Sequence, residues 1–191
     1  MVIQRERRRF TPEEYLRLED QSEFKSEYCD GEIFAMTGGS LNHNRILLNL
    51  VEEVRRSLQG RPCEVFSSDV RLLVERFTLF TYPDLLVVCG PPSLMKERED
   101  TLTDARLIAE VLSTSTEAYD RGEKFRMYRA LPSLQDYLLI AQSEVRVERH
   151  QRQAEHEWLW TEWTDPGDRL VVPSLQVEIP LDRIYRGIAF S

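Results

Sequence analysis

The sequence predicts a mixed α/β or α+β domain. Its 191 residues suit one sheet, a few helices and a sizeable core. Hydrophobic residues make up 41% of the chain and charged residues 30%, which is the balance of a folded globular protein rather than a disordered one. Segments with helical periodicity alternate with strand-like segments, and this order favours a single domain over residues 1–191.

The N-terminal part of the sequence predicts a helix followed by a hairpin. Residues 1–9 are basic and are expected to form a flexible N-terminus. Residues 11–14, Thr-Pro-Glu-Glu, provide an N-cap, a proline at the first helical position and the glutamate of a capping box, so a short helix is expected through Leu18. Strand-like residues on both sides of Asp30-Gly31 predict a hairpin over residues 25–36.

The middle of the chain predicts one long helix and two strands. Apolar residues recur at helical spacing over residues 42–58. Residues 69–74 alternate in part and are expected to form a strand. Residues 80–89 contain the run Leu-Leu-Val-Val, which is typical of a strand buried on both faces. Residues 90–103 hold two prolines and several charges and are expected to form a long exposed loop.

The C-terminal half predicts a second buried strand, a helix and further strands. Residues 106–112 form the buried strand, and residues 113–116, Ser-Thr-Ser-Thr, end it and can cap a helix over residues 117–131. Leu131-Pro132 stops that helix. The remaining strand-like segments are residues 137–141, 145–148, 158–160, 170–172 and 175–179.

The charge of the chain limits the kind of partner it can bind. A formal net charge of −8 argues against a protein that coats nucleic acid nonspecifically, because phosphate binding favours a positive surface. It does not exclude a nuclease, since metal-binding carboxylates are themselves acidic and bound cations reverse the local sign. The sequence contains no run of about 18 apolar residues, so no membrane-spanning segment is expected.

The three cysteines, Cys29, Cys63 and Cys89, are far apart and odd in number. No C-x-x-C pair occurs, so neither a disulfide framework nor a structural zinc site is expected. Reduced thiols in a cytoplasmic protein are the simplest interpretation.

The strongest indication of function is a carboxylate inside a buried strand. Glu110 shares a strand face with Ile108 and Leu112, where a charged group is costly unless it is paired, hydrogen-bonded or bound to a cation. Asp84 poses the same problem at the start of its apolar run, and it follows Pro83 at a strand-entry position. Either acid alone could equally form a structural ion pair or cap a loop.

Two acids on neighbouring strands can converge on one divalent cation. Mg²⁺ prefers oxygen ligands, and one or two carboxylates with waters and substrate phosphate complete its shell. A metal-bound water can then attack a phosphodiester while the metal stabilises the developing charge. The next helix carries Asp120, Lys124 and Tyr128 on one stripe, and Lys124 could hold the attacking water or the scissile phosphate. The alternative is a surface ion pair between Asp120 and Lys124.

These motifs occur in an order that resembles a known family. The core set is Tyr82-Pro83-Asp84, then Ile108-Ala109-Glu110-Val111-Leu112-Ser113, then Asp120, Lys124 and Tyr128. Flanking matches are residues 10–15, residues 27–33, His43 with Ile46, and residues 134–140. Covering about three quarters of the chain, the ordered set resembles the Uma-type endonuclease family of the restriction-endonuclease-like, or PD-(D/E)XK, superfamily.

The resemblance implies a restriction-endonuclease-like core, in which helices flank a central mixed β-sheet, with extra C-terminal strands and an active site at one edge of the sheet. It also implies hydrolysis of nucleic acid phosphodiesters with Mg²⁺ or Mn²⁺, and Asp84 and Glu110 match the acidic motif positions. The superfamily motif expects lysine where this chain has Leu112, and a leucine cannot orient a water. Lys124 on the following helix is the natural replacement.

Four further residues are candidates for the site, each with a structural alternative. Glu27 matches an acidic family position and could join the metal site or cap the hairpin. Asp69 would lie near Asp84 if their strands pair as a hairpin. His43 could contact phosphate, although packing or helix capping is the simpler role. Tyr128 could orient the site or pack in the core.

Three functional hypotheses follow. The first is a cytoplasmic, homodimeric endonuclease that hydrolyses DNA phosphodiester bonds, with Asp84 and Glu110 binding the metal and Lys124 positioning water or phosphate; no membrane partner or organic cofactor is expected. The alternative is a catalytically degenerate nuclease fold that acts as a nucleic-acid-binding or protein-interaction module, which Leu112 and the acidic charge favour. The third is a metal hydrolase that acts on another substrate, such as a nucleotide.

Overall fold

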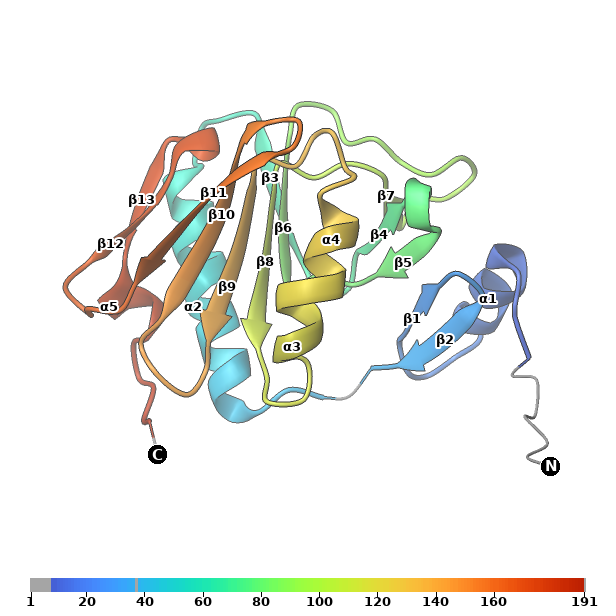
Figure 1. The fold of residues 1–191 in the computed structure, drawn as a ribbon, viewed down its shortest axis with the longest axis horizontal. Helices are drawn as coiled ribbons and strands as arrows, with labels where there is room; N and C mark the ends of the chain where they lie inside the picture. Colours follow the sequence, from blue (N-terminus) through green and yellow to red (C-terminus); the bar gives the residue numbers. More distant parts are fainter. Residues whose placement is uncertain (1–7, 37, 191) are drawn as a thin grey trace.

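The computed structural model describes residues 8–36 and 38–190 (Figure 1). Its centre is a six-stranded sheet with the strand order β11-β10-β9-β8-β6-β3. These strands are β3 (Cys63–Ser67), β6 (Leu85–Cys89), β8 (Leu107–Leu112), β9 (Asp136–Ala141), β10 (Val147–Ala154) and β11 (Glu157–Trp163). Strands β8 and β9 run parallel, and the other neighbours in this sheet run antiparallel. The sheet is therefore mixed, as expected.

A second sheet lies beside the first (Figure 1) and has the order β2-β1-β5-β4-β7. Its strands are β1 (Ser26–Cys29), β2 (Glu32–Ala35), β4 (Arg71–Val74), β5 (Leu79–Thr81) and β7 (Thr101–Leu102). A 3₁₀ helix, Glu75–Phe77, joins β4 to β5. Helix α1 (Pro12–Glu19) covers this sheet, because Tyr15 packs against Tyr28 and Phe80.

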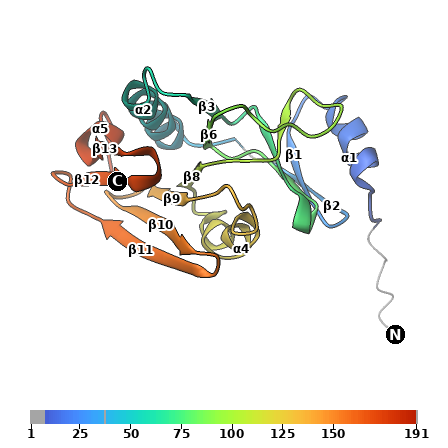
Figure 2. The same cartoon turned by 90° about the horizontal axis from the view of Figure 1, so that it is seen from above.

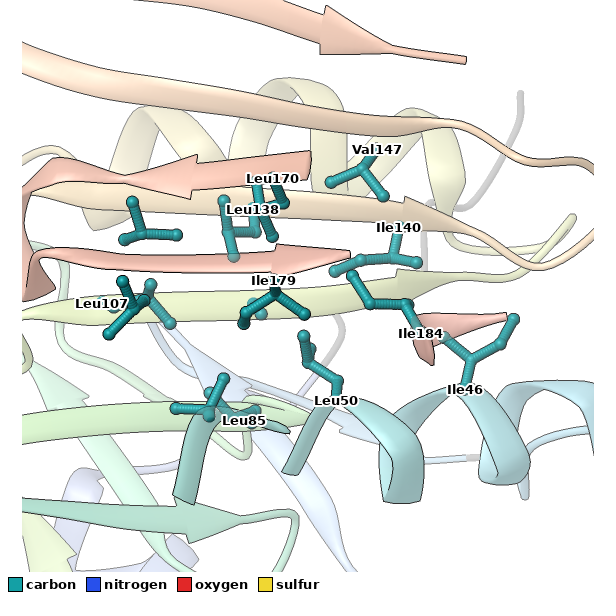
Figure 3. Packing of buried hydrophobic residues seen from close by; sticks show 14 of the residues in the cluster. Ile46, Leu50, Leu85, Leu107, Leu138, Ile140, Val147, Leu170, Ile179 and Ile184 are labelled. Carbon is teal, nitrogen blue, oxygen red and sulfur yellow. The ribbon is translucent and has the colours of Figure 1, made fainter. Parts of the chain in front are cut away.

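One face of the six-stranded sheet carries the main apolar core. Helix α2 (Leu41–Ser57), the hairpin of β12 (Arg169–Val172) and β13 (Val177–Pro180), and helix α5 (Leu181–Ile184) cover this face. Figure 2 shows them on the side of the sheet opposite α4 (Phe125–Tyr128). In Figure 3, Ile46 of α2 lies beside Ile184 of α5, and Leu50 of α2 points from the helix toward the strands. Burying each such side chain contributes about 1.5 to 3 kcal/mol.

Several local sequence signals are confirmed. The Thr11 hydroxyl accepts a hydrogen bond from Glu14 N at 3.2 Å, and the Glu14 carboxylate accepts one from Thr11 N at 2.9 Å, which completes the capping box of α1. Asp30 and Gly31 have φ values of 44° and 93°, the left-handed conformation that a two-residue hairpin turn requires. Ser40 caps α2, since its hydroxyl accepts from His43 N at 3.1 Å.

Two predictions for the middle of the chain were wrong in detail, and one strand was not predicted. Residues 80–89 do not form one strand, because the ladder breaks at Tyr82-Pro83 as the chain crosses from β5 in one sheet to β6 in the other. The edge strand β3 was not predicted. The predicted exposed loop over residues 90–103 ends in β7, whose two residues are buried beside β4.

The helical segment after β8 is shorter and less regular than predicted. It consists of α3 (Glu117–Tyr119), a π-helical turn (Asp120–Lys124) and α4, and it ends at Tyr128 rather than residue 131. The N-cap residue Thr116 makes no capping bond with its side chain, although Ser113 Oγ accepts from Thr116 N at 3.2 Å. Turns of the π type are rare and often occur at functional sites.

The prediction of reduced thiols was wrong for two cysteines, because Cys63 and Cys89 form a disulfide. They are cross-strand partners in the antiparallel pair of β3 and β6, with Cα atoms 4.0 Å apart. Their separation of 26 residues conceals this proximity when β3 is not predicted. Cys29 is free. The expectation of a cytoplasmic location rested on reduced thiols and loses that support.

The chain before α1 was expected to be flexible over residues 1–9. Residues 1–7 lie outside the described residues. Arg8 and Arg9 form exposed ion pairs with Glu14 at 3.5 Å and Asp30 at 3.6 Å. Within the described part of the chain, no helix combines the length and apolar character needed to cross a membrane.

Candidate functional site

The acidic residues singled out in the sequence, with the exception of Asp69, meet between the two sheets. Glu110 belongs to β8, Asp84 immediately precedes β6, and Glu27 belongs to β1 of the second sheet. The segment from α3 to α4 stands between the sheets (Figures 1 and 2) and brings Lys124 to the same place. Four elements distant in the sequence therefore build one cluster.

Glu110 is the most buried acid of the cluster, with 5% of its side chain exposed. Its oxygen Oε1 accepts a hydrogen bond from the Tyr128 hydroxyl at 2.9 Å and lies 3.1 Å from Lys124 Nζ. The other oxygen, Oε2, accepts from the backbone amide of Asp84 at 3.2 Å. Both oxygens thus have donors, which is what makes a carboxylate tolerable inside a strand.

Asp84 is held by the strand next to its own. Its oxygen Oδ2 accepts from the backbone amide of Val111 at 2.8 Å and from His43 Nε2 at 3.1 Å. Val111 follows Glu110 in β8, so the same stretch of backbone fixes both acids. Among the described residues, Asp84 Oδ1 has no hydrogen-bond donor, and this oxygen is available to a ligand.

Lys124 lies at the centre of the acids, with 8% of its side chain exposed. Its ammonium is 3.0 Å from Glu27 Oε1, 3.1 Å from Glu110 Oε1 and 3.7 Å from Asp120 Oδ1. The alternative of a surface ion pair with Asp120 does not describe this geometry, because both residues are buried. One ammonium is shared by three carboxylates.

The pKa values of the cluster reflect burial first and the excess of negative charge second. Burial raises the pKa of Glu110, and the neighbouring acids raise it further, which together outweigh the opposing effect of Lys124. The pKa of Asp120 is raised by burial in the same way. Burial alone would lower the pKa of Lys124, but Glu110 and its neighbours raise it well above its ordinary value. A further cation would stabilise the ionised acids.

Two hydroxyl groups, those of Thr81 and Tyr128, form hydrogen bonds with acids of the cluster. The Thr81 hydroxyl donates to Glu27 Oε1 and lies 3.5 Å from the Tyr128 hydroxyl. Tyr128 is fully buried, and its hydroxyl donates to Glu110, so this side chain packs in the core and also contacts the cluster. Thr81 was missed by sequence analysis, because a threonine in a short strand carries no distinguishing signal.

Asp69 lies outside the cluster. Its side chain is 86% exposed and forms an ion pair with Lys25. The condition for a place near Asp84, a hairpin of their two strands, is not met, since β4 pairs with β5 and β7 whereas Asp84 leads into β6 of the other sheet.

His43 directs its ring to Asp84, and the capping role belongs to Ser40. Burial would lower the pKa of His43, but the hydrogen bond and charge of Asp84 outweigh burial and raise it. Gly39 approaches the ring closely: a Cβ atom at this position would lie 2.8 Å from His43 Nδ1. The absence of a side chain at Gly39 therefore leaves room for this orientation of His43.

The position at which the superfamily motif expects lysine is part of the core. Leu112 is 3% exposed and belongs to an apolar cluster with Ile108 and Tyr137. Lys124 comes from the neighbouring helical segment, and its ammonium reaches Glu110 on the same face of β8. The geometry thus allows a lysine from another segment to occupy the space beside the strand acid.

The fit of a divalent cation depends on the ligands that the cluster offers. The described residues contain no group of three or more Asp, Glu, His or Cys side chains that could hold a metal ion by themselves. Mg²⁺ does not require one, since one or two carboxylates, waters and substrate phosphate usually hold it. Asp84 and Glu110 offer oxygen ligands, and hydrogen bonds of the kind seen behind them orient metal-binding carboxylates. This pair could hold Mg²⁺ or Mn²⁺.

The cluster opens to solvent on the side of Asp84. The exposed fraction of the side chain is 19% for Asp84 and 17% for His43, against 8% for Lys124 and 5% for Glu110. A substrate would therefore meet Asp84 and His43 before it reaches Lys124.

Known proteins are similar in sequence to this chain over most of its length. Residues 12–182 match the family model Uma2, which is described as “Putative restriction endonuclease”. “Uncharacterized protein slr1290” of Synechocystis sp. is 40% identical over 184 residues, which cover 95% of this chain and 94% of that protein. “Uncharacterized protein sll1609” of the same organism is 41% identical over 152 residues, which cover 80% of this chain and 86% of that protein.

A solved structure shares the fold. It is the crystal structure of “a putative nuclease belonging to DUF820” from Anabaena variabilis, and it matches with a TM-score of 0.76 and 18% identity over 94% of this chain and 99% of that chain. At this identity the likeness concerns the fold alone. The predicted fold class, a restriction-endonuclease-like core with a central mixed sheet flanked by helices, is confirmed.

Proposed function

Because this chain belongs to the Uma2 family, we propose that it is a divalent-metal-dependent endonuclease that hydrolyses DNA. The observation that carries the proposal is the coupling of Asp84 and Glu110. The backbone amide of Asp84 donates to Glu110 at 3.2 Å, and the backbone amide of Val111 donates to Asp84 at 2.8 Å. Two carboxylates are thereby fixed at the adjoining ends of two neighbouring strands, beside a buried lysine.

In this proposal Asp84 and Glu110 hold Mg²⁺ or Mn²⁺. When bound, such a cation lowers the pKa of a coordinated water and stabilises negative charge on a phosphate. Lys124 binds the attacking water or a phosphate oxygen beside Glu110, from which its ammonium is 3.1 Å away. Glu27 and Tyr128 are positioning residues, since Glu27 contacts Lys124 at 3.0 Å and Tyr128 contacts Glu110 at 2.9 Å.

His43 serves this site from the exposed side of Asp84. Its Nε2 donates to the Asp84 oxygen that also accepts from Val111 N, so His43 orients the carboxylate and leaves Oδ1 free for the cation. A homodimer would present two such sites to the two strands of a duplex. Sedimentation of the protein with and without DNA tests that part of the proposal.

The experiment for the activity is DNA cleavage in the presence of Mg²⁺ or Mn²⁺. Cleavage is expected from the wild type and is expected to disappear in Asp84→Asn and Glu110→Gln and on addition of EDTA. Asp69→Asn is the matched control, because it removes the same charge from an exposed acid outside the cluster. Circular dichroism establishes that each variant is folded. Equal cleavage by all four proteins would exclude the proposed site.

The second candidate function is a degenerate nuclease fold that binds nucleic acid or protein without cleaving it. The contacts of Lys124 favour it, because this ammonium pairs with both Glu27 and Glu110 and so supplies positive charge to these acids itself. It predicts no divalent-ion binding at Asp84 and no cleavage under any metal. DNA binding that is the same in wild type and Asp84→Asn, without cleavage by either, would support it.

A further inference from the structure

A second feature of the molecule is a basic pocket away from the acidic cluster. Its volume is about 590 Å³, and its lining includes four arginines and two aromatic residues: Arg76, Phe77, Arg126, Arg129, Arg152 and Trp158. These residues come from the 3₁₀ helix between β4 and β5, from α4 and the residues after it, and from the hairpin of β10 and β11. Figure 1 shows α4 standing between the central sheet, which includes β10 and β11, and the second sheet, which includes β4 and β5.

The positive charge of this pocket is largely uncompensated. Arg76 and Arg129 form no ion pair with any residue that the structure describes, and Arg126 pairs with Glu123 at 2.9 Å. Arg152 donates to backbone carbonyls, among them Leu134 O at 2.7 Å. The pocket is therefore positively charged, although the chain as a whole carries a net charge of −8.

One carboxylate lines the pocket. Glu155 is 87% exposed and lies 3.9 Å from His156. Burial lowers the pKa of the Arg152 guanidinium, Glu155 opposes this effect, and the neighbouring Arg129 adds to it. The arginines therefore repel one another, and a bound anion would relieve that repulsion.

The aromatic residues hold the guanidinium groups in fixed orientations. The Arg126 guanidinium lies 4.8 Å from the centre of the Phe77 ring, and that of Arg152 lies 4.5 Å from the Trp158 ring. The N–H groups of Arg152 donate to backbone carbonyls, and those of Arg126 pair with Glu123. The N–H edges that remain for a phosphate oxygen are therefore mainly those of Arg76 and Arg129. The chemistry is that of phosphate recognition by arginine.

The pocket is a separate surface from the acidic cluster. Lys124 and Arg129 belong to one helical segment, Arg129 being its C-cap. Five residues of an α-helix correspond to about 140° of rotation around the axis, so the two side chains leave the segment in different directions. Lys124 is buried in the cluster, whereas Arg129 is exposed and lines the pocket.

We propose that this pocket binds the phosphodiester backbone of DNA at a second place on the molecule, apart from the acidic cluster. The identification of the ligand as DNA rests on the proposed function. Binding of DNA by the arginines of the pocket does not depend on a metal ion. Arg76 and Arg129 provide the free charges, and Arg126 and Arg152 provide guanidinium groups held in place by Phe77 and Trp158.

The test is binding of a short fluorescein-labelled DNA duplex, measured by fluorescence anisotropy in EDTA at several salt concentrations. The double variant Arg76→Gln/Arg129→Gln removes the two unpaired charges. It is expected to fold, because both side chains are exposed and neither forms a hydrogen bond with a residue that the structure describes. Arg55→Gln is the matched control, since Arg55 is an exposed arginine on α2, which covers the opposite face of the sheet (Figure 2).

The double variant is expected to bind the duplex more weakly, and the slope of log K against log salt should fall by about 0.9 for each phosphate contact removed. Arg55→Gln should match the wild type, and Glu155→Gln should bind more tightly. The lysine variant Arg76→Lys/Arg129→Lys should retain most of the salt slope, because it keeps the charges.

Unchanged binding in the double variant, or equal weakening in Arg55→Gln, would overturn the proposal. Inorganic phosphate is added at the same concentration as the phosphate groups of the duplex. If it displaces the duplex from the wild type, the proposal is also overturned, because the pocket would then be a site for small anions. The outcome is independent of cleavage. A wild type that binds through the arginines but does not cleave would contradict only the proposed function, and a double variant that binds normally beside a cleaving wild type would contradict only the pocket.

Discussion

The backbone amide of Asp84 donates a hydrogen bond to Oε2 of Glu110 at 3.2 Å, although 26 residues separate the two acids. The contact exists because β6 and β8 are antiparallel neighbours, with Leu85 opposite Ala109. The reverse contact, from the amide of Val111 to the Asp84 carboxylate, is 2.8 Å long. Each acid is therefore held by the backbone of the other strand, which fixes the pair before a cation binds.

Replacing Glu110 by glutamine is expected to remove a pH-dependent loss of stability. Burial raises the pKa of Glu110 above its ordinary 4.5, so the folded protein keeps a proton that the unfolded chain has lost. The free energy of unfolding therefore falls as the pH rises from 4.5 to the raised pKa. Urea unfolding in EDTA should show this fall in the wild type and a smaller one in Glu110→Gln. Equal pH slopes would contradict the raised pKa.

Lys124→Met is expected to destabilise the metal-free protein by about 3 to 5 kcal/mol near neutral pH, the usual cost of removing one partner from a buried ion pair. The ammonium of Lys124 contacts Glu27, whose carboxylate would lose its cation, and Glu110, which would lose a hydrogen-bond donor inside the protein. Chemical denaturation measures it, with Lys96→Met as the control because that side chain is 91% exposed. A loss no greater than that of the control would mean that the cluster is not held by Lys124.

Gly39→Ala is expected to displace the His43 ring from Asp84. A Cβ atom at Gly39 would lie 2.8 Å from Nδ1 and 3.0 Å from Cγ of that ring. Because Asp84 is what raises the pKa of His43 against the effect of burial, the pKa should fall when the contact is lost. An NMR titration of His43 measures the change. Gly38→Ala is the control, since nothing lies within 4 Å of a Cβ atom there; the same His43 pKa in both variants would argue against this packing.

Reduction of the disulfide between Cys63 and Cys89 is expected to destabilise the protein. Closing a loop with a sequence separation of 26 residues corresponds to about 3.5 kcal/mol in the chain-entropy description. Thermal unfolding with and without a reducing agent, and of Cys63→Ser/Cys89→Ser, measures the effect. Cys29→Ser is the control, because Cys29 is free. Identical melting temperatures in oxidising and reducing buffer would show that the bridge does not contribute.

Much of the fold was predictable because the signals are local. The capping box at Thr11 and the turn at Asp30-Gly31 each depend on a few adjacent residues, and both occur in the structure. The passage of the chain between two sheets at Tyr82-Pro83 depends on long-range pairing that no local pattern records. The same limitation hid the disulfide, since the pairing of β3 with β6 brings its cysteines together.

The cluster itself was predictable only in part. Glu110 stands out in the sequence because it is an acid in an apolar strand, and Lys124 stands out through its spacing from Asp120. No pattern in the sequence indicates the role of Thr81 or the π-helical turn around Lys124. Asp69 resembles Asp84 in sequence as an acid at the start of a strand, yet the pairing of its strand places it in solvent beside Lys25.

The most direct test of the proposed metal site is Mn²⁺ binding measured by isothermal titration calorimetry. The wild type and the control variant Asp69→Asn are expected to bind Mn²⁺, and Asp84→Asn and Glu110→Gln are expected to lose most of that binding while remaining folded. Addition of Mg²⁺ should displace the Mn²⁺ from the wild type. Binding that persists unchanged in Asp84→Asn and Glu110→Gln, or a wild type that binds no Mn²⁺, would contradict the assignment of these two acids as the metal-binding pair.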